Sequence, residues 1–458
     1  MGCVISGLQD WSQDAASHGV SHDDDRIVDS RVASILESFE KGGYENHSAA
    51  DKQWWGGLMR TAVVLFTRDL RINDHPALAA ACANAETVVP LYVIDPALVG
   101  RSPNRDRFIS QSLADLRSAL INLGGDLVIR RGDPVAETIR LAGEVGAEGV
   151  AVSADVSRYA RRREQRLQID CDQHRLALRL FPGLTVVDPG TLTPSGSDHY
   201  RVFSPYHRAW AAAKRRQELA APERLSLPPG MEVGRLPEPP IGESPAAAKG
   251  GQTAAHRQLD EWLDHIVEYR ETHNDLAADS TSRLSPYLRF GCLSPLTVAN
   301  SPRTQGESEP YLRQMCWRDF YYQVANAFPD LATRAYRPGV IEPWRDAPDA
   351  LAAWAEGRTG VPIVDAGMRQ LRAEGWMHNR ARLVAGSYLT KQLRIDWRLG
   401  YAEFGRWLLD GDLPNNAGNW QWVAGTGNDT RPYRRFSPQR QSERYDPDGA
   451  YVARYAGA

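Results

Sequence analysis

The sequence predicts an α/β domain with a doubly wound parallel sheet, then a long linker, then an α-helical domain. Short apolar runs alternate with helical stretches after residue 58, which is typical of a parallel sheet covered by helices on both faces. Residues 222–250 are rich in proline, glycine and alanine and indicate a linker across the surface. Beyond them helical periodicity dominates to about residue 425, with almost no strand signal.

The apolar runs give the expected strands of the first domain. They lie at 62–66, 87–94, 127–129 and 149–152, with helices expected at 76–85, 107–123, 135–146 and 158–174. Such sheets often bind nucleotide-like ligands beyond the carboxyl ends of their strands. The sequence contains no GxGxxG, GxxxxGK[ST] or HExxH motif, so the fold class alone predicts no particular activity.

Composition excludes several classes of protein. Hydrophobic residues make up 42% and charged residues 24%, which indicates a globular protein with sizeable cores. No apolar run approaches the roughly 20 residues that span a bilayer, and no signal peptide begins the chain. The five cysteines are scattered, which argues against a disulfide framework or a zinc site. We therefore expect a cytoplasmic protein without a metal centre or a membrane contact.

The charge is unevenly distributed along the chain. Residues 1–58 hold ten acidic and four basic side chains, which leaves 47 acidic and 50 basic side chains in residues 59–458. The first segment is interpreted as an acidic extension, or as sequence upstream of a true start at Met59, because it cannot bury a core alone. The remaining boundaries are expected at 59–190 for the α/β domain, 191–255 for the connection and 256–458 for the helical domain.

Residues 281–286 combine hydroxyl side chains with a helix start. Ser285 is expected to cap a helix whose first residue is Pro286. Hydroxyls beside free backbone N–H groups are suited to a pyrophosphate. An ordinary helix cap is the simpler explanation for this segment taken alone.

The helix expected at 311–328 has two faces with different chemistry. Every fourth residue of one face is apolar, which predicts a buried stripe: Leu312, Cys316, Phe320, Val324 and Phe328. The other face carries an amide, a guanidinium and two aromatic rings, which suit a base: Gln314, Trp317, Arg318 and Tyr321. A tryptophan on a helix is nevertheless more often part of a core.

Residues 375–386 carry a further polar helix face, formed by Asn379, Arg382, Leu383 and Gly386. A glycine inside a helix costs about 1 kcal/mol relative to alanine, so Gly386 is expected to let something flat approach. His378 taken alone is interpreted as structural rather than catalytic.

The densest polar segment runs from residue 410 to residue 422. It contains the two carboxylates Asp410 and Asp412, adjacent amides and two tryptophans. If a helix begins near Leu413, Asp412 caps it, and Asn416 and Trp420 follow on the same face. Carboxylate, amide and indole then face one site, suited to the edge of a heteroaromatic ring beside a redox-active side chain. A capped helix alone does not account for the paired carboxylates.

The last part of the chain mixes arginines with aromatic residues. Such a mixture suits a nucleic-acid backbone, with a solvated face as an equally good explanation. The residues are Arg431, Arg434, Arg435, Arg440, Arg444, Tyr433, Phe436 and Tyr445.

Together these segments resemble the photolyase/cryptochrome family, specifically the class I cyclobutane pyrimidine dimer DNA photolyases. The resemblance extends from about Thr61 to Tyr451. It rests on VVLFTRDLRINDHPAL from residue 63, TSRLSPYL from 281, WRDFYYQ from 317, TGVPIVDAGMRQLRAEGWMHNRAR from 359, LRIDWR from 393, DGDLPNNAGNWQW from 410 and GTGNDTRPYRRFSPQRQSERYDPDG from 425.

The resemblance implies a Rossmann-like antenna domain, an FAD-binding helical domain and a role for individual residues. The adenosine-diphosphate part of FAD is implied at Tyr269, Thr281, Ser282, Leu284 and Ser285. The flavin pocket is implied at Gln314, Arg318, Asn379, Arg382, Asp410, Asp412 and Asn416, with Asn416 facing flavin N5. The DNA lesion is implied at Gln314, Trp317, Asn379, Arg380, Trp422 and Arg435. The chain of residues that photoreduces the flavin is implied at Trp420, Trp397 and Trp344.

The implied function is blue-light-dependent repair of cyclobutane pyrimidine dimers in UV-damaged DNA. The dimer is flipped out of the duplex and receives an electron from excited, reduced FAD. An antenna chromophore is also implied, with 8-hydroxy-5-deazaflavin favoured over methenyltetrahydrofolate, because the cysteine-lysine pair of folate-binding members has no match near Thr333. A monomer without an obligate protein partner is expected.

Two rivals share the fold. The (6-4) photolyases have two consecutive histidines where this chain has His378 and Asn379. Plant-type cryptochromes carry an aspartate at the position of Asn416. A non-catalytic flavin or DNA-binding relic is the alternative from another class. Two substitutions depart from the class I pattern, because Gln314 stands where many members have glutamate and Leu383 where methionine is common.

Overall fold

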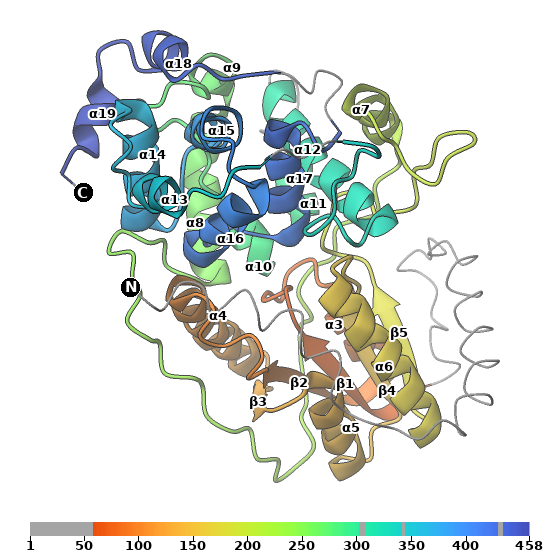
Figure 1. The fold of residues 1–458 in the computed structure, drawn as a ribbon. Coiled ribbons are helices and arrows are strands. Elements are labelled where there is room, and N and C mark those ends of the chain that lie inside the picture. Colours follow the sequence, from red (N-terminus) through yellow and green to blue (C-terminus); the bar gives the residue numbers. More distant parts are fainter. Residues whose placement is uncertain (1–57, 302–307, 341–343, 429–433, 458) are drawn as a thin grey trace, which may run out of the picture. The chain divides into compact units, whose positions relative to one another are not determined.

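The computed structural model describes residues 58–301, 308–340, 344–428 and 434–457. It contains a parallel sheet with helices on both faces, followed by a helical part, and so confirms the predicted fold class (Figure 1). Residues 1–57 of the acidic segment predicted at 1–58, together with Arg431 and Tyr433, lie outside the described residues. No helix among those described is both long and apolar enough to cross a membrane.

Five parallel strands form the sheet in the order β3-β2-β1-β4-β5. They are β1 (Met59–Phe66), β2 (Ala85–Ile94), β3 (Val128–Arg131), β4 (Gly149–Ser153) and β5 (Ala177–Phe181). In the centre, Val63 of β1 is paired with Val89 of β2 and Val150 of β4. The four expected strands are confirmed within a few residues. The fifth, β5, was not predicted.

Alternation along β1 sends side chains to the two faces of the sheet. Val63 and Leu65 pack under the helices α5 (Pro134–Glu144) and α6 (Arg158–His174). The side chains between them, such as Val64, belong to the core under α3 (Pro76–Asn84) and α4 (Pro103–Asn122). The second core continues into the helical domain, so the two parts share apolar packing.

The linker predicted at 222–250 runs over the surface of the sheet domain, and it follows α7 (Phe203–Ala212). Figure 1 shows it as a long green trace passing along the β3 side of the sheet. Its backbone accepts hydrogen bonds from the sheet, from Val88 N to Ser226 O at 2.8 Å and from Ile129 N to Val233 O at 2.8 Å. The connection therefore also covers the edge strand β3, whose N–H groups would otherwise be exposed.

The loop after β1 joins the two domains. The guanidinium of Arg71 is fully buried and donates to Gly291 O at 3.0 Å and to Gly183 O at 2.9 Å. Gly291 has a φ of 65°, and a Cβ there would lie 2.1 Å from Arg68 O. This close approach explains why glycine stands at the end of the helix that contacts the β1 loop.

The helical domain surrounds helix α17 (Leu413–Ala424). This helix packs against α12 (Glu309–Ala327), α15 (Asn379–Ser387) and α16 (Trp397–Trp407). The other helices of at least four residues are α8 (Gln252–Leu263), α9 (Tyr269–Thr272), α10 (Ser285–Phe290), α11 (Pro295–Asn300), α13 (Pro348–Ala355), α14 (Pro362–Glu374), α18 (Pro438–Tyr445) and α19 (Ala450–Arg454). A π-helical turn, Tyr388–Gln392, follows α15.

Candidate functional site

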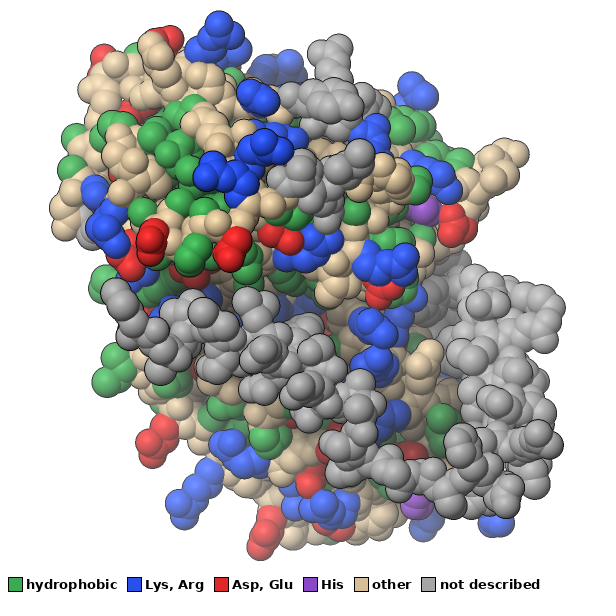
Figure 2. All heavy atoms as spheres, viewed as in Figure 1, with side chains coloured by type: hydrophobic (Ala, Val, Ile, Leu, Met, Phe, Trp, Pro, Cys, Tyr) green, Lys and Arg blue, Asp and Glu red, His purple; other side chains and the backbone are tan. Residues whose placement is uncertain are grey.

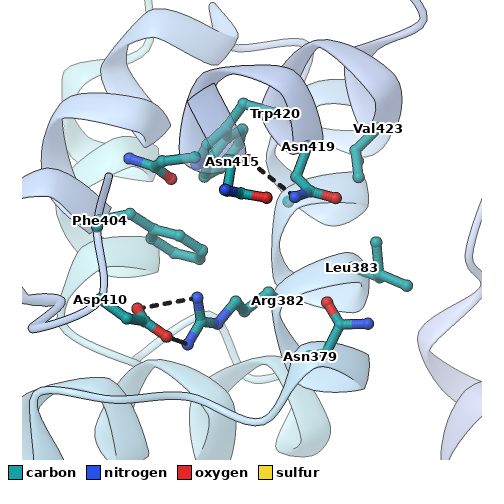
Figure 3. A pocket seen from close by; sticks show the side chains of 12 residues that line it. Asn379, Arg382, Leu383, Phe404, Asp410, Asn415, Asn419, Trp420 and Val423 are labelled. Atoms are coloured by element: carbon teal, nitrogen blue, oxygen red, sulfur yellow. Dashed lines mark hydrogen bonds and ion pairs between the residues drawn. The ribbon is translucent and has the colours of Figure 1, made fainter. Parts of the chain in front are cut away.

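A polar pocket lies between α15, the end of α16 and α17 (Figure 3). It brings together amides, one guanidinium, one carboxylate and two aromatic rings. Its lining comprises Asn379, Arg382, Leu383, Gly386, Phe404, Asp410, Gly411, Asn415, Asn416, Asn419, Trp420 and Val423. Segments that are separate in the sequence, at 379–386 and 410–423, therefore meet in one site, as the resemblance implied.

An ion pair fixes the guanidinium of the pocket. Arg382 contacts Asp410 with both terminal nitrogens, Nη2 to Oδ2 at 2.7 Å and Nη1 to Oδ1 at 3.1 Å. Its Nε donates to Met377 O at 2.8 Å. The Asp410 side chain is only 5% exposed. A two-point pair of this kind holds the positive charge in one orientation (Figure 3).

The expected helix cap at Ser285 is wrong. Ser285 is the first residue of α10, and Leu284 at the cap position makes no side-chain cap bond. The Ser285 hydroxyl instead donates to Asp410 Oδ2 at 2.6 Å. A hydrogen bond to a charged carboxylate is stronger than one from a peptide N–H, so the tertiary contact prevails. Nearby, Thr281 Oγ1 is buried and meets no hydrogen-bond partner among the described residues.

The expected cap at Asp412 is confirmed. Its Oδ1 accepts from Asn415 N at 2.8 Å, and α17 begins at Leu413. Asn416 and Trp420 follow on the face that lines the pocket, and Asn416 Nδ2 donates to Tyr401 O at 3.3 Å. Asp412 itself does not line this pocket, because its carboxylate lies under the first turn of α17.

Trp420 is the aromatic wall on α17 and is only 3% exposed. Its indole lies against Phe404, with ring centroids 4.9 Å apart, and against Trp354 at 6.0 Å. A Cβ at Gly386 would lie 3.5 Å from the indole, an ordinary contact. The flat group expected to approach Gly386 is therefore the indole of Trp420. Beside this indole there is no room for a side chain at Gly400 of α16, where a Cβ would lie 2.2 Å from Trp420.

We predict that Gly400→Ala lowers the free energy of unfolding by about 1–3 kcal/mol, because the methyl group displaces the Trp420 indole. Gly405→Ala is the matched control, since Gly405 lies in the same helix and a Cβ there meets nothing within 4 Å. The control is expected to stabilise the protein by up to about 1 kcal/mol. Urea unfolding of both variants decides the point, and equal stabilities would contradict the packing argument.

The three tryptophans expected to carry electrons share one core. Trp397 is fully buried at the start of α16, and Trp344 packs on the same cluster, which also contains Trp420. The indole Nε1 atoms of Trp397 and Trp344 are buried and meet no acceptor among the described residues. The rings therefore have an apolar environment in common.

The residues expected at the DNA lesion do not line this pocket, with the exception of Asn379. Trp317 is half-buried and stacks on Phe203, with ring centroids 3.6 Å apart. Trp422 is also half-buried, whereas Gln314 and Arg435 are exposed. Arg380 lies over the ring of Tyr445 at 4.3 Å. On the face shown in Figure 2, arginine and lysine side chains gather over the helical domain and along its border with the sheet domain.

The remaining predicted residues lie on neighbouring elements. Tyr269 packs edge to face with Tyr311, whose hydroxyl donates to Ser282 Oγ at 3.2 Å. Leu284 is fully buried. Arg318 donates to Leu184 O at 2.6 Å rather than lining the pocket of Figure 3.

Sequence reasoning missed Phe404, Asn415, Asn419 and Val423. Asn419 Nδ2 donates to the backbone O of Asn415 at 2.8 Å, and both residues line the pocket from α17. Their spacing of four residues was a usable signal, whereas Phe404 has the pattern of any core residue. The structural interpretation of His378 is supported, since its Nδ1 accepts from Arg380 N and caps α15. Burial and the charges of Arg380 and Arg382 lower the pKa of His378 to about 4.

A second cavity, of about 750 Å³, lies at the carboxyl ends of the strands. Residues after β1, β2 and β4 line it, among them Arg68, Asp95 and Asp155, and the helical domain contributes Arg289. Burial, with the charges of Arg68 and Arg105, lowers the pKa of Arg289 to about 9. Arg289 Nη1 is buried and contacts no acceptor in the described part of the chain. No set of His, Cys, Asp and Glu side chains within that part is suited to hold a metal.

Comparisons with known proteins identify the family to which the two domains are similar. Residues 62–224 match the DNA photolyase family, and residues 311–457 match the FAD binding domain of DNA photolyase. The chain is 45% identical to a deoxyribodipyrimidine photo-lyase of Streptomyces griseus, covering 86% of this chain and 89% of the relative. It is 36% identical to a cryptochrome DASH of Natronomonas pharaonis, with 86% and 89% covered.

A solved structure gives the same picture. The class III photolyase from Agrobacterium tumefaciens superimposes with a TM-score of 0.82 at 33% identity, over 86% of each chain. Its likeness spans the sheet domain and the helical domain alike. Since both family models match and a relative is 45% identical over most of its length, the chain belongs to the photolyase/cryptochrome family.

Proposed function

We propose that this protein repairs cyclobutane pyrimidine dimers in UV-damaged DNA, using blue light and bound FAD, as a class I photolyase. The observation that carries the proposal is the pocket in which Asp410 orients the Arg382 guanidinium and α17 presents the neutral amide of Asn416. A fixed positive charge beside a neutral amide suits a flavin that works in its anionic reduced form. The relatedness to a deoxyribodipyrimidine photo-lyase supports the same activity.

The residues present fit FAD. The pocket offers amide and guanidinium donors for the edge of a flavin ring, at Asn379, Arg382 and Asn416. The buried hydroxyl of Thr281, without a partner among the described residues, is a donor suited to a diphosphate. When bound and reduced, FAD supplies the electron that opens the cyclobutane ring. The protein orients the ring edge, stabilises its charge through Arg382 and excludes water with Phe404 and Trp420.

The lesion would contact the half-buried tryptophans Trp317 and Trp422. A flipped-out pyrimidine dimer is suited to flat apolar walls, and flipping costs a few kcal/mol, less for damaged bases. Phe203 backs the ring of Trp317 face to face, which holds that indole in place. Gln314 of the same helix is exposed and available to hydrogen-bond the lesion.

The proposed function is tested by irradiating oligothymidine with UV light and following the recovery of absorbance under blue light. The FAD content of the same sample is recorded. Recovery only under blue light supports dimer repair. FAD that is bound and reducible without any recovery would favour a photoreceptor, the rival to which the cryptochrome DASH relative points. Protein without FAD would contradict the proposed cofactor.

The cavity of the sheet domain is proposed to hold the antenna chromophore, with 8-hydroxy-5-deazaflavin preferred to methenyltetrahydrofolate. Its volume of about 750 Å³ suits a multi-ring ligand. Tyr92 and Tyr159 provide aromatic surface in the lining. The unpartnered Nη1 of Arg289 supports a ligand with an anionic or strongly accepting oxygen, and the ring oxygen of the deazaflavin is such a group.

We predict that Arg289→Leu weakens binding of added 8-hydroxy-5-deazaflavin by tenfold or more, about 1.4 kcal/mol, because a buried charge-assisted hydrogen bond is lost. Arg101→Leu is the matched control, since Arg101 lies at the exposed rim of the cavity. Fluorescence titration of both variants gives the affinities. Equal affinities of the two variants would refute the assignment.

A further inference from the structure

Arg68 extends from the loop after β1 into the helical domain. Its Nη1 contacts Asp155 Oδ2 of the sheet domain at 3.1 Å, and its Nε donates to Arg289 O at 3.1 Å. Its Nη2 donates to the hydroxyl of Tyr322 on α12. A guanidinium offers donors in a rigid plane, so these three contacts determine both its position and its orientation.

Tyr322, on α12, links Arg68 to α17. The helices α12 and α17 pack against each other (Figure 1). The Tyr322 hydroxyl accepts from Arg68 and from Arg318 Nη2, the latter at 3.2 Å. Burial raises the pKa of Tyr322 to about 12, so the phenol keeps its proton. Both neighbours donate, and the hydroxyl therefore directs its own proton to Asp412 Oδ2, 3.0 Å away.

Asp412 receives this hydrogen bond on the oxygen that does not cap the helix. Oδ1 accepts from Asn415 N at 2.8 Å, while Oδ2 contacts Tyr322 and lies 4.0 Å from Arg68 Nη2. The side chain is 4% exposed, so no solvent replaces these partners. The cap carboxylate is therefore held from the side of the sheet domain, and the residue after Asn415 is Asn416 of the pocket.

The charges on this path favour the ionised states of Arg68 and Asp155. Burial alone would lower the pKa of Arg68, but Asp155, Tyr322 and Asp412 raise it well above its usual value. Although burial opposes ionisation of Asp155, the charges of Arg68 and Arg163 help lower the pKa of that carboxyl. Removing Arg68 would leave two buried carboxylates without their shared cation, which is costly.

We infer that Arg68 is a positioning residue for the flavin: through Tyr322 and Asp412 it sets the first turn of α17, and with it the amide of Asn416. The inference rests on the proposed function, since the flavin beside Asn416 belongs to that proposal. The sheet domain then does more than hold an antenna, because one of its arginines tunes the reaction centre of the other domain.

The test uses the full-length protein with its flavin and the variants Arg68→Met, Arg68→Lys, Tyr322→Phe and the double variant Arg68→Met with Tyr322→Phe. Arg161→Met is the matched control, because Arg161 also extends from the sheet domain to α12, where it donates to Asn326 O, one turn from Tyr322. Two properties are measured: the midpoint potential of the bound flavin, and hydrogen exchange of the amides of Asn415 and Asn416.

In Arg68→Met and Tyr322→Phe we expect a lower midpoint potential and an exchange about fivefold to tenfold faster, the ratio that corresponds to a weakened helix cap. The double variant should exceed neither single variant, because both act through one path. Arg68→Lys should resemble Arg68→Met, since a lysine keeps the charge without the planar set of donors. Arg161→Met should match the wild-type protein.

Several outcomes would overturn the inference. A wild-type midpoint potential and wild-type exchange in both Arg68→Met and Tyr322→Phe would do so. Wild-type values in Arg68→Lys would also do so, because they would show that only the charge of Arg68 matters. Additive shifts in the double variant would contradict a single path. If the wild-type protein retained no FAD, the proposed function would fail, but the exchange measurement would still decide whether Arg68 sets the first turn of α17.

Discussion

Replacing Arg382 by methionine is expected to lower the retention of FAD strongly and to destabilise the protein. Asp410 is 5% exposed and has two basic contacts, both from Arg382, besides the hydroxyl of Ser285. Removing the guanidinium leaves a buried carboxylate without its cation, which costs about 3–5 kcal/mol in comparable pairs. In the proposed function Arg382 is also the positive partner of the flavin, so we expect at least a tenfold lower ratio of flavin to protein after purification.

A second variant separates the two effects. Arg382→Met combined with Asp410→Asn removes the unpaired charge, and the amide can still accept from Ser285. This double variant should recover most of the free energy of unfolding, measured with urea, but not the flavin, measured by visible absorbance. A double variant with a full complement of flavin would show that Arg382 supports the fold and not the cofactor.

Local signals in the sequence predicted those features that local chemistry decides. Asp412 was expected to cap a helix from Leu413, and it does, because the carboxylate and the N–H of Asn415 are three residues apart. Helical periodicity likewise predicted that Asn379, Arg382 and Gly386 share one face of a helix, and they line the pocket from α15 or its end. Four strands were recognised because they are apolar on both faces.

Features decided by distant contacts were not predictable in this way. Ser285 has every local property of a helix N-cap, but its hydroxyl donates a hydrogen bond to Asp410, which is 125 residues away in the sequence. Phe404 enters the pocket from a helix whose apolar face is indistinguishable from ordinary core. Strand β5 was missed because it is an edge strand with alternating exposure, so it lacks the continuous apolar run of the central strands. The motif after β1 likewise joins two domains, which no local pattern reveals.

Trp397→Phe is expected to slow photoreduction of the oxidised flavin by about a hundredfold or more, which corresponds to about 2.7 kcal/mol in the barrier. Phenylalanine is much harder to oxidise than tryptophan, and Trp397 shares the buried core of Trp420 and Trp344. Chemically reduced protein should repair dimers at the wild-type rate, because the proposed repair takes its electron from the flavin. Transient absorption after a blue flash measures the first rate, and oligothymidine repair the second.

Trp354→Phe is the matched control for Trp397→Phe. Trp354 is as buried as Trp397, and its ring lies 6.0 Å from that of Trp420, edge to face. Its indole N–H donates to Ala385 O at 3.1 Å, whereas that of Trp397 meets no acceptor among the described residues. If proximity to Trp420 alone decided the route, both variants would slow photoreduction. We expect only Trp397→Phe to do so, since Trp354 is fully buried, whereas Trp344, half-buried on the same core, gives the chain through Trp397 a way to solvent.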